Sequence, residues 1–136
     1  MNQQEANEAA PGATGKTRNG SAQIVWTDTG VAGATADFWY EDTYLYEQEC
    51  CGGSVHGGAT VTIVEERVGG YQVWVRARGL IDRNYRVETE KEAREIAARA
   101  QDVIAGLLSR HAEDAQAWEA EFDRLLGWGG PYGHQG

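Results

Sequence analysis

Hydrophobic and polar positions alternate along residues 23–88, whereas apolar positions recur at helical spacing along residues 90–126. Alternation is typical of a strand with one buried face, and a recurrence near 3.6 residues is typical of an amphipathic helix. All strand-like segments precede the helical one, so the pattern predicts an α+β fold: an antiparallel sheet of four to five strands with a long or kinked C-terminal helix, or two helices, on one face. Thr89, with Glu92 three residues later, predicts the capping box that begins the helix.

A hairpin is predicted where the β-rich runs 61–67 and 71–78 flank the turn residues 68–70. Alternate side chains of the second run form two sets, the apolar Tyr71, Val73, Val75 and Ala77 and the more polar Gln72, Trp74, Arg76 and Arg78. We expect the apolar set to face the helix and the other set to lie on the open face of the sheet.

The helical pattern is longer than the sheet it should cover. A continuous helix would extend ~55 Å at 1.5 Å per residue, whereas a strand of this sheet would extend ~20–24 Å. Helices of that length are rare, which favours a break or sharp kink between Gly106 and Ala112. The distal apolar side chains, Trp118, Phe122 and Leu125, are covered either by folding back or by a second molecule. Because Gly106 alone is a weak breaker, we favour the second molecule, and therefore a homo-oligomer.

The two ends of the chain lack the periodic apolar positions of a core. We expect a disordered N-terminal arm over residues 1–20, a single domain over 21–128 and a flexible tail over 129–136. The arm has no apolar signal segment, and no later stretch approaches the ~20 apolar residues that span a membrane. These features predict a cytoplasmic protein that does not contact a membrane.

The net charge is −9, and the segment between Asn19 and Glu66 holds eight acidic residues and no Lys or Arg. This charge argues against direct binding to nucleic acid, because phosphate contacts require an excess of basic residues. The acidic interaction candidates are Glu41, Asp42, Glu47 and Glu49.

Two motifs invite a chemical interpretation that their context does not support. Residues 10–17 match a relaxed phosphate-loop pattern, but the sequence predicts no apolar strand before them and no helix after them.

Cys50, Cys51 and His56 share a glycine-rich loop, but adjacent cysteines lack the spacing of a zinc site. Their Cα atoms lie about 3.8 Å apart, below the usual ~4.4–6.8 Å of a disulfide. We therefore expect no catalytic residue, no cofactor and no bound metal.

The remaining candidates lie on the predicted open face, where Trp39 joins Trp74, Arg76 and Arg78. Tryptophan beside arginine is the composition of interface hot spots. The sequence thus favours a small acidic, non-catalytic protein-interaction or assembly module that self-associates. The alternative is an acidic inhibitor of the kind phages deploy, which mimics nucleic acid toward a basic protein target.

Overall fold

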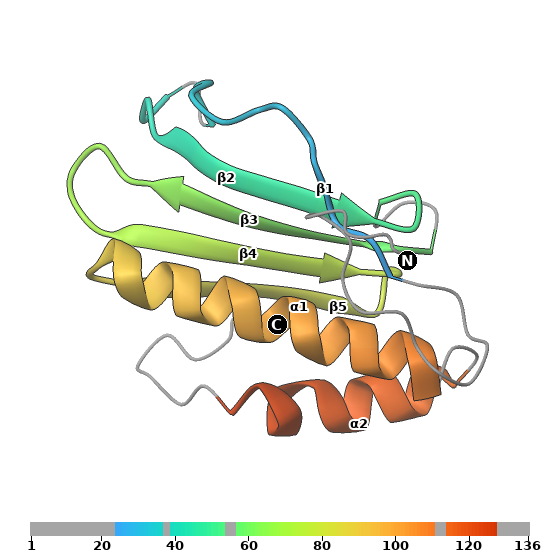
Figure 1. The fold of residues 1–136 in the computed structure, drawn as a ribbon. Coiled ribbons are helices and arrows are strands. Elements are labelled where there is room, and N and C mark those ends of the chain that lie inside the picture. Colours follow the sequence, from blue (N-terminus) through green and yellow to red (C-terminus); the bar gives the residue numbers. More distant parts are fainter. Residues whose placement is uncertain (1–23, 37–38, 54–56, 111–113, 128–136) are drawn as a thin grey trace, which may run out of the picture.

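The computed structural model describes residues 24–36, 39–53, 57–110 and 114–127. Its elements, in chain order, are β1 (Thr27–Asp28), β2 (Thr43–Cys50), β3 (Ala59–Glu65), β4 (Tyr71–Ala77), β5 (Ile81–Val87), α1 (Glu90–Arg110) and α2 (Ala115–Leu126). The strands form a five-stranded antiparallel sheet in sequential order, and both helices lie on the same face of it (Figure 1). The predicted α+β fold is confirmed. The predicted N-terminal arm and C-terminal tail lie outside the described residues.

The predicted hairpin is formed by β3 and β4, which pair from Ala59 opposite Ala77 to Glu65 opposite Tyr71. Its turn contains Gly69 and Gly70 with φ values of 108° and 94°. These are left-handed backbone conformations that side chains with a Cβ rarely adopt, so the turn requires glycine here.

The core lies between the sheet and α1. Val73, Val75 and Ala77 of β4 are fully buried, as the predicted facing requires, and α1 meets them with a stripe of small and branched residues. That stripe consists of Ala93, Ile96, Ala97, Ala100, Ile104 and Leu107. Alanine at several of these positions keeps the helix close to the sheet. The capping box is also confirmed, because Thr89 Oγ1 accepts a bond from Glu92 N at 3.1 Å and Glu92 Oε1 accepts one from Thr89 N at 3.2 Å.

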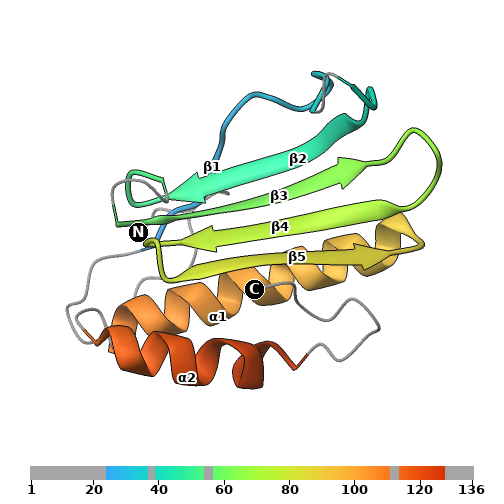
Figure 2. The ribbon, with the colours of Figure 1, turned by 180° about the vertical axis from the view of Figure 1, so that it is seen from behind.

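The chain folds back after α1, and α2 returns alongside it (Figure 2). Helix α1 runs through Gly106 without a break, and α2 starts from an N-cap at Asp114, whose carboxylate accepts a bond from Ala117 N at 3.1 Å. Trp118 and Phe122 are fully buried against α1 and the sheet, and Leu125 is partly buried. The chain itself therefore covers these side chains, which corrects our expectation that a second molecule covers them.

Two polar contacts fix α2 in this position. The Arg83 side chain on β5 donates two parallel bonds to Asp123, Nε to Oδ1 at 2.9 Å and Nη2 to Oδ2 at 3.0 Å. These bonds raise the pKa of Arg83, which keeps the guanidinium charged. Arg99 of α1 donates to the carbonyl of Leu126 at 3.0 Å. Both contacts lie in the last turn of α2, and they hold that end of the helix against β5 and α1.

In the described part of the chain, neither helix is long and apolar enough to cross a membrane.

Replacing Trp118 by alanine should lower the free energy of unfolding by about 3–5 kcal/mol, because it leaves a large cavity beneath α2. The same substitution at Trp39, which is 81% exposed, should change it by no more than about 0.5 kcal/mol. Urea unfolding of both variants at low protein concentration measures the difference. A Trp118→Ala protein as stable as the Trp39→Ala control would show that the chain does not bury Trp118 in solution.

Candidate functional site

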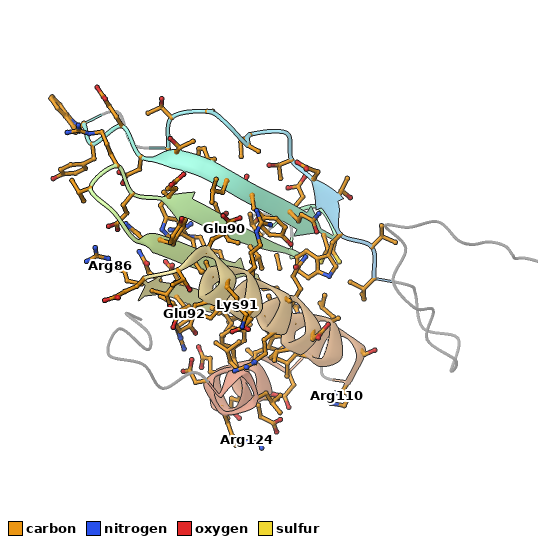
Figure 3. The ribbon with its side chains drawn as sticks, turned by 60° about the vertical axis from the view of Figure 1, so that its left-hand side comes forward. Arg86, Glu90, Lys91, Glu92, Arg110 and Arg124 are labelled. Atoms are coloured by element: carbon orange, nitrogen blue, oxygen red, sulfur yellow. The ribbon has the colours of Figure 1, made fainter. Side chains whose placement is uncertain are left out.

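A hollow of about 500 Å³ lies on the open face of the sheet, at the end where the β3–β4 turn, the end of β5 and the start of β2 meet. It is lined by Tyr40, Asp42, Glu66, Arg67, Val68, Gln72, Asn84 and Arg86. Arg86, labelled in Figure 3, lies at this end of the sheet. The lining residues of β4 and β5 alternate with the buried Val73, Tyr85 and Val87, which places the hollow opposite the helices.

A chain of hydrogen bonds forms the wall of this hollow. Glu66 is only 7% exposed, and its two oxygens accept from Arg86 Nη2 at 2.7 Å and from Gln72 Nε2 at 2.5 Å. The side-chain amide oxygen of Gln72, Oε1, in turn accepts from Trp74 Nε1 at 2.9 Å and from Asn84 Nδ2 at 3.0 Å. Each partner fixes the next, so the orientation of the Gln72 amide is determined. A buried carboxylate is tolerated here because both of its oxygens are satisfied.

A second buried carboxylate joins the loop before β2 to the β3–β4 turn. Asp42 accepts a bond from the backbone N–H of Arg67 at 3.0 Å. This contact brings Tyr40 and Val68 to the same hollow from segments far apart in the sequence.

Large exposed apolar side chains gather at this end of the molecule. Among the described residues, four large hydrophobic side chains are exposed: Val68 (84%), Trp39 (81%), Tyr40 (66%) and Val25 (44%). Tyr40 and Val68 line the hollow, and Trp39 directly precedes Tyr40. We call Trp39, Tyr40, Arg67, Val68 and Arg86 the rim.

The tryptophan and arginines predicted on β4 divide between two places. Trp74 is partly buried on the open face, where it meets the edge of the Tyr44 ring at a centroid distance of 6.1 Å and an angle of 83°. The guanidinium of Arg76 lies 5.4 Å from the Trp74 ring centroid and pairs with Asp82 at 3.4 Å. Arg78 does not join them, because the strand ends at Ala77 and Arg78 has φ of 57°.

Arg78 instead lies over the ring of Trp118, with its guanidinium carbon 5.4 Å from the centroid. The left-handed backbone at Arg78 interrupts the alternation that placed it on the open face. Its predicted position is therefore wrong.

The acidic residues do not form one continuous free anionic face. Asp42 and Glu66 are buried, and Glu47 accepts hydrogen bonds from Thr29 Oγ1 at 2.9 Å and Thr62 Oγ1 at 2.5 Å. Glu49 is partly buried, and Glu41 is exposed with φ of 58°. Within the described residues, several carboxylates thus serve the chain's own hydrogen bonding, and fewer remain for a partner than the sequence suggested.

No group of three or more His, Cys, Asp or Glu side chains in the described residues could hold a metal ion. Cys50 is buried and Cys51 exposed, both as free thiols, and His56 lies outside the described residues.

Sequence reasoning missed the hollow and most of its rim. Gln72, Trp74 and Arg86 were recognisable as outward positions, but their association depends on the pairing of Gln72 with Arg86 and of Trp74 with Asn84. Tyr40 and Val68 belong to loops, and no local pattern predicts where a loop side chain lies.

Comparisons of the chain with protein-family models, with curated proteins and with solved structures find no match.

The wall of the hollow can be tested by comparing two arginines on the same face. Arg86→Ala leaves the buried Glu66 without its charged partner and should cost about 1–3 kcal/mol of stability. Arg76→Ala breaks a pair in which both groups are largely exposed and should cost at most about 1 kcal/mol. Chemical denaturation in matched buffers measures both values. Equal costs would mean that the bond between Arg86 and Glu66 does not hold in solution.

Proposed function

We propose that this protein is a small acidic protein-interaction module, not an enzyme, and that it binds a protein partner through the rim. The observation that carries the proposal is the position of the three most exposed large apolar side chains of the described residues, Trp39, Tyr40 and Val68. Tyr40 and Val68 line a hollow at one end of the sheet, and Trp39 directly precedes Tyr40 in the chain. Scattered exposed apolar residues need no explanation, whereas a cluster beside a concave surface is typical of a contact site.

The composition of the rim supports protein contact. Tryptophan, tyrosine and arginine are the residues most enriched at interface hot spots, and the rim contains all three, with Arg67 and Arg86 lining the same hollow as Tyr40. A volume near 500 Å³ accommodates a single protruding side chain of a partner.

The hydrogen bonds behind the rim lower the cost of binding. Glu66, Gln72 and Asn84 are already ordered by one another, so the wall of the hollow need not become ordered when a partner arrives. Binding to an organised surface loses less conformational entropy than binding to one that must rearrange.

The net charge of −9 favours a partner with a basic surface, since opposite charges accelerate the encounter of two proteins and disfavour acidic competitors.

A second copy of the chain is another candidate partner. In a symmetric dimer the same rim would be buried on both copies. The folding back of α2 removes our original reason for self-association, so the rim is now the surface proposed for it.

The acidic inhibitor is the second candidate. Its support is the excess of acidic residues in the first half of the chain, and the internal bonds of Asp42, Glu47 and Glu66 weigh against it. Binding to a basic target that weakens steeply with added salt would favour the inhibitor, because screening acts on exposed charges.

A capture experiment with two matched variants tests the proposal. The intact protein, a Trp39→Ala/Val68→Ala variant and a Val25→Ala variant are immobilised and exposed to an extract of the cells that produce the protein. Val25 is also exposed, but it lies just before β1, which pairs with the distal half of β2 far from the hollow. Partners identified by mass spectrometry should be retained by the Val25→Ala control and bind the rim variant at least about tenfold more weakly.

Light scattering of the three purified proteins tests the second copy as partner. Self-association through the rim predicts a larger species for the intact protein and the control, and a monomer for the rim variant. Partners or oligomers that persist unchanged in the rim variant would refute the rim as the contact surface.

A further inference from the structure

Cys50 and Cys51 lie where β2 ends, at the opposite end of the sheet from the hollow. Cys50 is 2% exposed, whereas Cys51 is exposed to solvent. Their sulfur atoms lie 2.7 Å apart. Carbon atoms in contact stand about 3.5–4.0 Å apart, and sulfur is the larger atom, so the two thiols are closer than ordinary packing would bring them.

The backbone explains why two consecutive side chains meet. Along a strand, neighbouring side chains point to opposite faces. Cys51 leaves the strand with φ of 63°, a left-handed conformation that turns its side chain back toward Cys50. Such conformations are costly for a residue with a Cβ and often occur at functional sites.

The surrounding glycines hold this turn in place. A Cβ added to Gly58 would lie 2.0 Å from the carbonyl oxygen of Cys50 and 2.8 Å from the carbonyl carbon of Cys51, so the bare backbone of Gly58 packs directly on the peptide that joins the cysteines. Gly53 N also donates to the carbonyl of Cys50 at 3.0 Å.

We propose that Cys50 and Cys51 form a redox-active vicinal dithiol, which a small-molecule disulfide such as glutathione disulfide oxidises to an intrachain disulfide between adjacent residues. The site is independent of the rim and of the proposed partner. Because adjacent Cα atoms lie about 3.8 Å apart, below the usual disulfide range, the ring is strained and the bond is readily reduced.

The different exposure of the two thiols assigns them different roles. The exposed Cys51 thiolate attacks one sulfur of glutathione disulfide, a mixed disulfide forms on Cys51, and one glutathione thiolate leaves. Cys50 then loses its proton to solvent and attacks the Cys51 sulfur, and the second glutathione leaves as a thiolate. The cysteine pair has lost two electrons and two protons, and one disulfide has become two thiols.

Burial raises the pKa of the Cys50 thiol to about 12, and the hydrogen bond to Cys51 adds to this. Cys50 is therefore protonated and unreactive until the mixed disulfide stands directly beside it. This property fits the resolving role and not the attacking one.

Intact-mass measurement tests the proposal on the full chain, because its two cysteines are this pair and every thiol signal reports on them. The reduced protein is incubated with glutathione disulfide and then analysed without reductant. We expect a monomer that has lost the mass of two hydrogen atoms, does not react with maleimide after unfolding, and recovers both thiols with dithiothreitol.

Two single variants separate the steps. Cys50→Ala should retain one glutathione on Cys51, because no resolving thiol remains, and Cys51→Ala should gain none, because Cys50 is buried. Thermal melting confirms that each variant is folded. A stable glutathione adduct on the intact protein, a disulfide-linked dimer, or two thiols that remain free after prolonged oxidation would each overturn the proposal.

Discussion

The apolar face of the sheet must be covered, and the way the chain covers it determines the rest of the fold. Helix α1 supplies a stripe of small and branched residues against β3, β4 and β5. Helix α2 then completes the cover with Trp118 and Phe122. The ion pair between Arg83 and Asp123 fixes the second helix at the β5 side. Because both helices lie on this face, no helix or strand of the described residues packs on the opposite face.

The open face is stabilised by different chemistry. Its centre is filled by Trp74, Tyr44 and the buried Val64, and its end is held by hydrogen bonds that converge on Glu66 and Gln72. Because polar side chains cover much of this face, it can be exposed to solvent without presenting a continuous apolar surface. The three most exposed large apolar side chains of the described residues, Trp39, Tyr40 and Val68, belong to loops at one end of the sheet, and this grouping sets the rim apart as a candidate site.

Periodicity predicted the parts of the fold in which each residue is placed by its neighbours along the chain. The burial of Val73 and Val75 and the start of α1 at its capping box follow from local spacing, and they were correct. Arg78 was misplaced because one left-handed residue after Ala77 ends the alternation, and nothing in the local sequence marks that conformation. The cover of Trp118 was misjudged because the helical spacing of apolar residues runs on from α1 into α2, whereas the structure has two separate helices, Glu90–Arg110 and Ala115–Leu126.

The candidate site was less predictable because it depends on contacts between distant segments. The bond from Arg86 to Glu66 joins residues on β5 and at the β3–β4 turn, and it exists only in the observed register. The contact between Asp42 and Arg67 joins two loops. The meeting of Cys50 with Cys51 depends on a backbone conformation that packing against Gly58 supports. Composition identified these residue types as candidates, and tertiary contacts decided which of them lie together.

The outer strands of the sheet have a consequence for aggregation and for the manner of binding. An unpaired strand at a sheet edge offers its backbone to other chains. At one edge, the segment from Thr27 to Thr35 runs alongside β2 and bonds to it at several points. Gly33 N, for example, donates to the backbone carbonyl of Tyr44 at 2.7 Å. At the other edge, β5 carries Asp82, Arg83 and Arg86, and charged side chains of this kind discourage the addition of a further strand. For the proposed interaction, this arrangement favours recognition through side chains over the addition of a strand to the sheet edge.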